Sequence, residues 1–305
     1  MPSITDTIRV GPAGWNYKDW YGIVYPKQAG KSFKELDFLA DFFDTIEINS
    51  TFYRPANTYM GHAWVKKVAH NPRFKFTAKL WQRFTHDRKD FTSAEVNQFI
   101  EGIDPLADAG KLGAVLCQFP WSFKNDETGR EWLADIIETF KDYSLVVEVR
   151  HSSWDVQDAY DFLDQKGVGF ASIDQPVIGR SIKPKAVLTG KIGYVRMHGR
   201  NYQAWFPKKG RGELTEMDKF ARYDYLYTDE ELDEWVEKIQ TVAENAQETY
   251  VIQNNHPKGQ AACNAFQLRA KLGEERVKVP ESMLSHFPQL ERIAEPTGNG
   301  QGELF

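Results

Sequence analysis

Short apolar and β-branched runs alternate with amphipathic stretches along most of the chain. The strand-like runs are Ile8–Gly14, Thr45–Asn49, Phe74–Lys79, Ala114–Gln118, Leu145–Arg150, Gly169–Asp174, Ile192–His198 and Tyr250–Asn254. Strands that alternate with helices form βαβ units, whose strands pair in parallel. Eight such strands in succession favour a closed barrel over an open sheet, so the pattern predicts a single-domain TIM-type (β/α)8 barrel.

The segments between these runs carry signals for helix starts. Ser32 with Glu35, and Thr228 with Glu231, have the spacing of a capping box, in which each side chain bonds the backbone of the other residue. The stretch 126–141 places its apolar side chains on one helical face. Helices are therefore expected to begin at Ser32 and Thr228 and to cover 126–141.

Two connections interrupt this regular alternation. Gln175–Lys191 has no clear helical pattern, and Gly199–Tyr227 is long and rich in aromatic and basic side chains. We therefore expect the barrel to be irregular around strands six and seven. Long loops in compact domains are often functional. Gly199–Tyr227 is accordingly predicted to be a mobile lid, with Lys208, Lys209 and Arg211 closing over an anion.

Composition narrows the class of protein. The chain has 305 residues, of which 41% are hydrophobic and 27% charged, and this fits one globular domain at 1–295 with a flexible Gly-rich tail at 296–305. A net charge of −5 argues against a broad nucleic-acid-binding face. No secretion signal or membrane-spanning run is evident, and Cys117 and Cys263 form no CxxC pair. We expect a cytoplasmic protein.

Polar side chains interrupt the apolar strands near one end. In most strands they share one parity, so they would gather at the barrel mouth if that face is the lumen. The set comprises Glu47, Asn49, Lys79, Gln118, Glu148, Arg150, Asp174, Arg196, His198 and Asn254. A buried ion network that only stabilises the barrel is the alternative. Desolvating so many charges costs several kcal/mol each, which favours a functional site.

Seven segments in order carry a resemblance to a known family. They are GPAGWNYKDWYGIVYP, EINSTFYRP, FKFTAKLWQRFTH, LGAVLCQFPWSF, VVEVRHSSW, YVRMHGR and the closing NN pair. The chain resembles the YecE-like family of uncharacterised proteins, domain-of-unknown-function family seventy-two, from about Ile8 to Leu272. The resemblance implies a TIM-type barrel and supplies no reaction. The motif positions fall here on Trp15, Tyr17, Trp20, Glu47, Asn49, Ser50, Tyr53, Lys79, Gln118, Glu148, Arg150, His198 and Asn254.

The candidates for catalysis are Glu47, Glu148, Asp174 and His198. Glu47 and Glu148 come from opposite sides of the barrel and could act as acid and base if their environments separate their pKa values. Alternatively, neighbouring cations neutralise both carboxylates. The same four side chains are of the types that bind divalent metals, but no metal-binding spacing is present. We identify no cofactor, and a divalent metal stays an alternative.

The candidates for substrate binding are cations, amides and aromatic rings of the mouth. They are Trp15, Tyr17, Asn49, Tyr53, Lys79, Gln118, Arg150, Arg196 and Asn254. Arginine matches phosphate and carboxylate groups with two hydrogen bonds, so these cations favour an anionic ligand. The rings after strand one could stack on a sugar or base, or only pack on the barrel rim.

Three functions fit these residues. The first is an enzyme that acts on a small anionic substrate, phosphorylated or sugar-like. The second is a metal-dependent hydrolase or nuclease-like repair factor that its C-terminal tail recruits. The third is a non-catalytic ligand-binding barrel.

The last five residues, QGELF, resemble the pentapeptide that binds the sliding clamp of bacterial DNA polymerase. Gln301, Leu304 and Phe305 stand at motif positions, whereas Gly302 replaces the usual apolar residue. In this interpretation Leu304 and Phe305 enter an apolar pocket and Gln301 bonds at its rim. The Gly-rich spacer after Pro296 provides reach.

We predict that the full-length protein binds purified sliding clamp through this tail. Deletion of Gln301–Phe305 should abolish the binding, which isothermal titration calorimetry can measure. If the intact protein does not bind at roughly tens of micromolar, the weak end for a short peptide, the clamp is not its partner.

Overall fold

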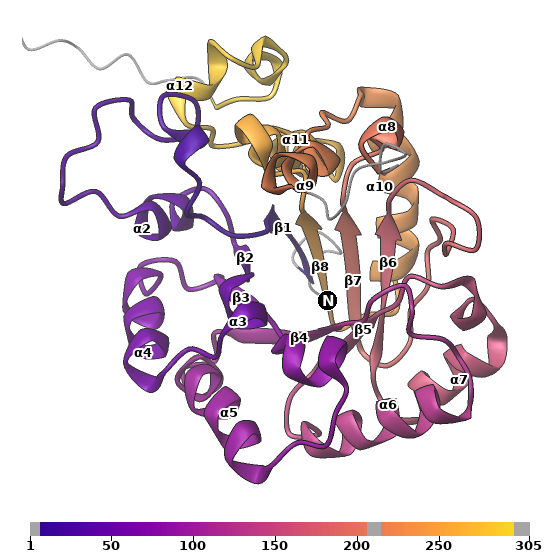
Figure 1. Cartoon of the computed structure of the whole chain (residues 1–305). Helices are drawn as coiled ribbons and strands as arrows, with labels where there is room; N and C mark the ends of the chain where they lie inside the picture. The colour runs from indigo at the N-terminus through magenta and orange to yellow at the C-terminus, as the bar shows by residue number, and fades with distance from the viewer. Residues whose placement is uncertain (1–6, 206–214, 296–305) are drawn as a thin grey trace, which may run out of the picture.

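The computed structural model describes residues 7–205 and 215–295, which form eight parallel strands around a barrel (Figure 1). The strands are β1 (Ile8–Pro12), β2 (Thr45–Ile48), β3 (Lys75–Lys79), β4 (Leu112–Gln118), β5 (Leu145–Glu148), β6 (Gly169–Asp174), β7 (Ile192–Met197) and β8 (Glu248–Gln253). Consecutive strands pair from β2 to β8, and β1 pairs with β8. The predicted TIM-type (β/α)8 barrel is confirmed.

The barrel closes between β1 and β2 through few contacts. An isolated parallel bridge joins Ala13 to Glu47, and the Gly14 amide donates to the Glu47 carbonyl at 2.9 Å. At Gly11 a Cβ atom would lie 1.9 Å from the Thr45 carbonyl oxygen. Glycine is therefore needed there, because any side chain would force the two strands apart.

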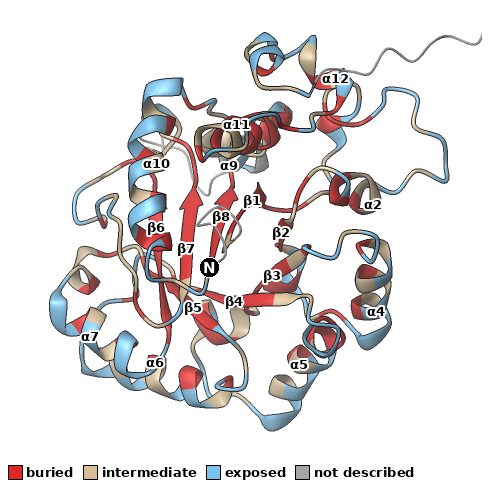
Figure 2. Ribbon diagram, turned by 180° about the vertical axis from the view of Figure 1, so that it is seen from behind, coloured by how far each residue is buried: buried red, intermediate tan, exposed pale blue. Residues whose placement is uncertain are grey.

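Helices surround the strands (Figure 2). The longer helices are α2 (Glu35–Ala40), α4 (Thr58–Lys67), α5 (Ser93–Asp108), α6 (Glu127–Thr139), α7 (Gln157–Gln165), α9 (Glu216–Tyr223), α10 (Asp229–Ala243) and α11 (Gln260–Lys271). Of these, the helices from α2 to α7, with α10 and α11, carry buried residues. Shorter helical turns are α3 (Ser50–Tyr53), α8 (Tyr202–Trp205), α12 (Glu281–Leu284), Lys18–Trp20, Arg83–Asp87, Ser152–Trp154, Pro257–Gly259 and Pro288–Arg292.

The crossover from β6 to β7 contains no helix, so the expected irregularity around strands six and seven is confirmed. An extended segment covers the outer face of β6 instead. The Val187 amide donates to the Ser172 hydroxyl at 3.1 Å, and the Thr189 hydroxyl donates to the Val168 carbonyl at 2.7 Å. The Ser172 side chain on the outer face of β6 and the Val168 carbonyl just before the strand thus hold the crossover.

One of the two expected helix starts is correct. Thr228 and Glu231 form the predicted capping box at the start of α10. Ser32 does not cap α2, which begins at Glu35 without a side-chain cap. The Glu35 carboxylate accepts a hydrogen bond from the Tyr21 hydroxyl at 2.6 Å, so it bonds the preceding loop and not the helix backbone.

An ion cluster occupies the end of the lumen where the strands begin. The Glu248 carboxylate lies 2.7 Å from Lys75 Nζ and 3.1 Å from Arg9 Nη1. Its second oxygen accepts from the Tyr250 hydroxyl at 2.5 Å. This end of a TIM-type barrel usually contributes to stability and not to catalysis. We therefore interpret the Glu248 cluster as a buried ion network that stabilises the barrel.

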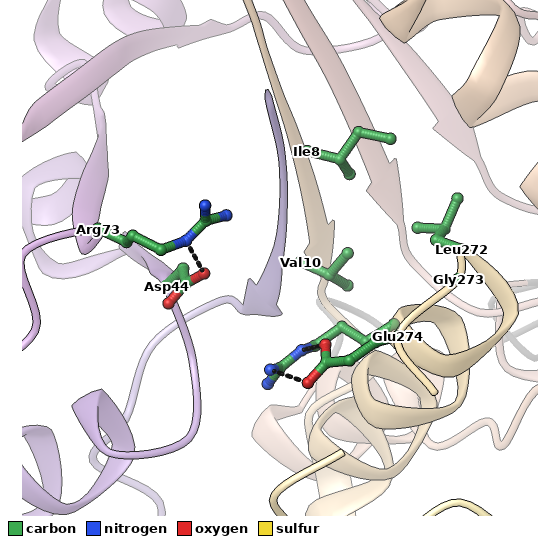
Figure 3. Close-up of a pocket in the computed structure, with 8 residues that line it drawn as sticks. Ile8, Val10, Asp44, Arg73, Leu272, Gly273 and Glu274 are labelled. Carbon is green, nitrogen blue, oxygen red and sulfur yellow. Dashed lines mark hydrogen bonds and ion pairs between the residues drawn. The ribbon is translucent and has the colours of Figure 1, made fainter. Parts of the chain in front are cut away.

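A cavity of about 310 Å³ lies near the same end, against β1 and the end of α11 (Figure 3). Arg73 Nε donates to Asp44 at 2.9 Å, and the Arg269 guanidinium bonds both oxygens of Glu274. Carboxylates therefore already hold its cations, and it lies far from the ends of the strands where barrel enzymes have their sites.

We predict that Glu248→Ala lowers the free energy of unfolding by about 3 kcal/mol, because Arg9 and Lys75 lose the carboxylate they share. Urea unfolding would measure this. Glu138→Ala, which removes an exposed pair with Lys141, should change the value by less than about 1 kcal/mol. Equal losses in the two variants would contradict a stabilising role for the cluster.

Candidate active site

Alternate residues of the strands face the lumen, and their polar members gather where the strands end. β-pairing aligns Glu47 with Thr77, and Gln118 with Glu148. The residues that interact at this mouth are Glu47, Lys79, Gln118, Glu148, Arg150, Arg196, His198 and Asn254. Because parallel strands all end at the same rim, the predicted parity brings most of the expected set together.

Arg196 lies at the centre of the mouth and links two carboxylates. Its Nη2 lies 2.6 Å from Glu47 Oε1 and its Nη1 lies 2.7 Å from Glu148 Oε2. Burial alone would lower the pKa of Arg196, but Glu148 and Glu47 raise it above its usual value. Arg196 is 1% exposed and is therefore a fixed cation whose two end nitrogens are both occupied.

The Glu148 carboxylate is bonded by several side chains at once. Besides Arg196, it pairs with Arg150 and accepts from Gln118 Nε2 at 2.6 Å. Burial would raise the pKa of this carboxyl, but Arg150 and Arg196 hold it well below its usual range. Glu148 is consequently ionised at neutral pH and is a weak base.

Glu47 is bonded on both of its oxygens. Oε1 pairs with Arg196, and Oε2 accepts from the Tyr194 hydroxyl at 2.9 Å. The same hydroxyl lies 2.9 Å from the Thr77 hydroxyl. The structure thus favours neutralisation of the two glutamates over their use as a free acid and base.

His198 is a neutral, hydrogen-bonded imidazole. Its Nε2 lies 3.0 Å from Arg150 Nη2, and its Nδ1 lies 2.9 Å from the Asn254 side-chain nitrogen. Burial and the Arg150 charge lower the pKa of His198 to about 3, although Glu148 opposes them. At neutral pH His198 therefore carries no charge.

Lys79 differs from the other charged groups of the mouth. Within the described parts of the chain its Nζ makes no ion pair or hydrogen bond, and it lies 4.4 Å from the centre of the Phe52 ring. Burial, followed by the Arg196 charge, lowers the pKa of Lys79 to about 8, while Glu47 and Glu148 oppose the shift. Lys79 is 8% exposed.

The mouth therefore has a small positive excess. Arg150 and Arg196 balance the two glutamates, and His198 is neutral. A protonated Lys79 adds one positive charge that no described carboxylate pairs with. This charge balance suits a ligand that brings a negative charge.

Asp174 does not join this cluster. Pairing of β6 with β7 sets Ile173 beside Arg196, so Ile173 faces the lumen and Asp174 faces outward. The Asp174 carboxylate lies 2.9 Å from Arg200 Nε. Burial raises the pKa of Asp174 against the effect of Arg200. The next residue, Gln175, reaches the mouth instead and accepts from Arg150.

A second cavity, of about 280 Å³, lies beside the mouth between the loops that follow β1 and β2. Trp15, Tyr17 and Asn49 line it, as does Trp64. The Tyr17 hydroxyl donates to the Ala13 carbonyl, and burial raises the pKa of Tyr17. Tyr53 is 70% exposed and lies at the rim.

Two residues of the mouth escaped the sequence-based candidates. Tyr194 lies two positions before Arg196 and was identifiable from the alternation in strand seven. Gln175 was not, because its position depends on the register of β6 against β7.

Some predicted residues lie outside the described ranges. They are Lys208, Lys209 and Arg211 of the expected lid, and Gln301, Leu304 and Phe305 of the tail.

The donor groups also bear on the metal alternative. In 7–205 and 215–295, no three His, Cys, Asp or Glu side chains are grouped to hold a metal ion.

Among the helices of the same two ranges, none has the length and apolar character to cross a lipid bilayer.

The strands, the surrounding helices and the polar mouth define a TIM-type barrel protein. The family model described as "Protein of unknown function DUF72" matches residues 9–289, so the chain belongs to this family. The resemblance found in the sequence motifs is thereby confirmed.

Similar proteins match this chain over nearly their whole length. The UPF0759 protein YunF of Bacillus subtilis (strain 168) is 29% identical over 273 residues, which cover 86% of this chain and 93% of YunF. A DUF72 family protein of Thermotoga maritima MSB8 has a crystal structure with a TM-score of 0.73 and 33% identity, covering 88% of this chain and 100% of that one. One from Enterococcus faecalis V583 has a TM-score of 0.74 and 24% identity, covering 87% and 95%.

We predict that Glu148→Gln changes how stability depends on pH. Because the folded-state pKa of Glu148 is lowered, its carboxylate stabilises the fold fully above about pH 5, and this contribution is lost as the pH falls towards the folded-state value. The variant should be about 3 kcal/mol less stable at pH 7, and the difference should shrink at low pH. Urea unfolding between pH 7 and pH 3 tests this. A constant difference across that range would be inconsistent with the buried ion pairs.

Proposed function

We propose that this protein is an enzyme that binds a small anionic substrate at the C-terminal mouth of the barrel, without an obligatory metal. The observation that carries the proposal is Lys79, a buried cation that has no ion-pair partner among the described residues. Ions buried without a partner are costly, and perturbed ionisable groups of this kind concentrate at functional sites.

Arg150 is the second anion-binding group. It pairs with Glu148, but its remaining contacts are to the neutral side chains Gln175 and His198. The Arg150 side chain is 13% exposed and can therefore be reached by a ligand. The side chains of both glutamates are buried and paired with Arg196. A ligand oxygen can replace these neutral partners without leaving a carboxylate unpaired. Arg196 has a different role, which is to fix the two glutamates and to contribute its field.

The described part of Gly199–Tyr227 lies close to this site, which supports the proposal that this segment covers it. The Tyr223 ring, at the end of α9, lies 6.2 Å from the His198 ring and 5.7 Å from the His256 ring. The cavity beside Trp15 and Tyr17 offers room for the uncharged part of a substrate. Aromatic walls of this kind suit a sugar or another flat group.

The alternatives have less support. The described residues offer no grouped metal donors, and Asp174 faces away from the mouth, so a metal-dependent hydrolase is disfavoured. Recruitment by a sliding clamp stays a prediction from QGELF alone. A non-catalytic barrel would bind the same anions, and turnover of any phosphorylated or carboxylated compound in a library screen would distinguish an enzyme from it.

We predict that inorganic phosphate binds the mouth and raises the melting temperature. Binding to the folded state alone stabilises it by about 2.7 kcal/mol at a concentration of 100 times Kd. Lys79→Met should weaken phosphate binding by roughly tenfold, because a charge-assisted hydrogen bond is lost. Thermal unfolding at increasing phosphate concentration measures the effect.

Lys141→Met is the control for this experiment, because Lys141 is exposed and pairs only with Glu138 among the described residues. The control should respond to phosphate like the unaltered protein. If Lys79→Met responds in the same way as the control, Lys79 is not part of an anion site.

A further inference from the structure

We propose that Lys79 is a nucleophile that forms a covalent imine with an aldehyde or ketone group of the substrate. The inference rests on the proposed function and specifies it: the substrate is a carbonyl compound that also carries an anionic group.

Two lysines on one strand and one face show the contrast. Lys75 Nζ lies 2.7 Å from the Glu248 carboxylate, so its amine has an ion-pair partner. Lys79, four residues further along the same face and at the mouth, has no such carboxylate partner within the described residues, and its Nζ faces the Phe52 ring at 4.4 Å. The Thr51 hydroxyl donates to the Lys79 carbonyl at 2.7 Å, which fixes the backbone from which the amine projects.

Burial is the main cause that favours an uncharged Lys79 amine, and the charges of Arg196 and Arg150 act in the same direction. The Glu47 and Glu148 carboxylates act against it and favour the protonated form. His86, whose ring lies 4.9 Å from the Phe52 ring, is neutral because burial and the Lys79 charge lower its pKa to about 4. With the pKa of Lys79 lowered to about 8, about one amine in ten is uncharged at pH 7, against about one in three thousand for an ordinary lysine.

An uncharged amine at this place can complete the reaction without another reagent. Its lone pair attacks the carbonyl carbon, a C–N bond forms, and a proton passes from nitrogen to the former carbonyl oxygen. The hydroxyl group then leaves as water together with the second proton of the former amine, and the C=N bond of the imine remains. Protonation of that nitrogen makes it an electron sink for breaking a bond next to the former carbonyl. Hydrolysis reverses the sequence and releases the lysine.

Arg150 supplies the second point of attachment. Its neutral partners Gln175 and His198 can yield to a carboxylate or phosphate of the same molecule. Binding at two points would hold the carbonyl carbon near Nζ, which favours attack by restricting the reactants.

The test uses two small aldehydes that carry an anionic group, glyoxylate and pyridoxal 5′-phosphate, with the full-length protein. Reduction with cyanoborohydride or borohydride converts an imine into a stable secondary amine, and peptide mass spectrometry locates it. We expect Lys79 to be modified first, and inorganic phosphate to slow the reaction. Lys75 is the internal reference and should stay unmodified. The rate at Lys79 should level off near pH 8, whereas that of exposed lysines keeps rising towards pH 10.

The variant Lys79→Arg keeps the positive charge and removes the nucleophile. It should lose the preferred site of modification, while thermal unfolding of the unaltered protein reports phosphate binding. Circular dichroism would check that it folds. If the unaltered protein binds phosphate but neither aldehyde modifies Lys79 ahead of the exposed lysines, the imine proposal is wrong and the anion site stands. If the protein neither binds phosphate nor shows preferred modification, both proposals are wrong.

Discussion

The ion pairs of Arg196 with Glu47 and Glu148 connect three strands across the lumen. Three charges are buried together here, and each would be costly alone. Their mutual pairing fixes the rotamers of two glutamates and makes the interior of the mouth rigid. Glu47 also takes part in the backbone bridge that closes the barrel. The same residue thus contributes to the closure of the sheet and to the electrostatics of the site.

This arrangement determines which groups are available for chemistry. The two glutamates are saturated, and His198 is held neutral by burial and by Arg150. Lys79 is left with a changeable protonation state at near-neutral pH. The fixed cations help to produce that state, because Arg196 destabilises a second positive charge nearby. A site that first looks like a set of acids and bases is better described as a rigid ion pair network around one amine.

Much of the fold and most of the site could be predicted from the sequence. Strand alternation works for Glu47, Lys79, Glu148 and Arg196 because each lies on a strand whose lumen face is marked by several polar residues. It fails for Asp174, since polar residues on β6 also face outward, where Ser172 bonds the crossover and Asp174 pairs with Arg200. The register between neighbouring strands decides whether a polar residue faces the lumen, and the sequence of one strand alone does not reveal that register. The pairing of Arg196 with both glutamates was likewise beyond reach, because it depends on distances across the lumen.

The small contact area between β1 and β2 has a consequence for how the chain folds during synthesis. β1 makes its continuous ladder with β8, from Ile8 beside Thr249 to Pro12 beside Gln253, and only an isolated bridge with β2. Of the eight strands, β1 is synthesised first, but it can form its ladder only after β8 has been synthesised. Contacts between residues so distant in sequence form slowly, and β2 to β7 must stay associated as an open sheet with two unpaired edges in the meantime. Exposed edges of this kind promote aggregation, so protection of the nascent chain by a chaperone would matter most just before β8 emerges.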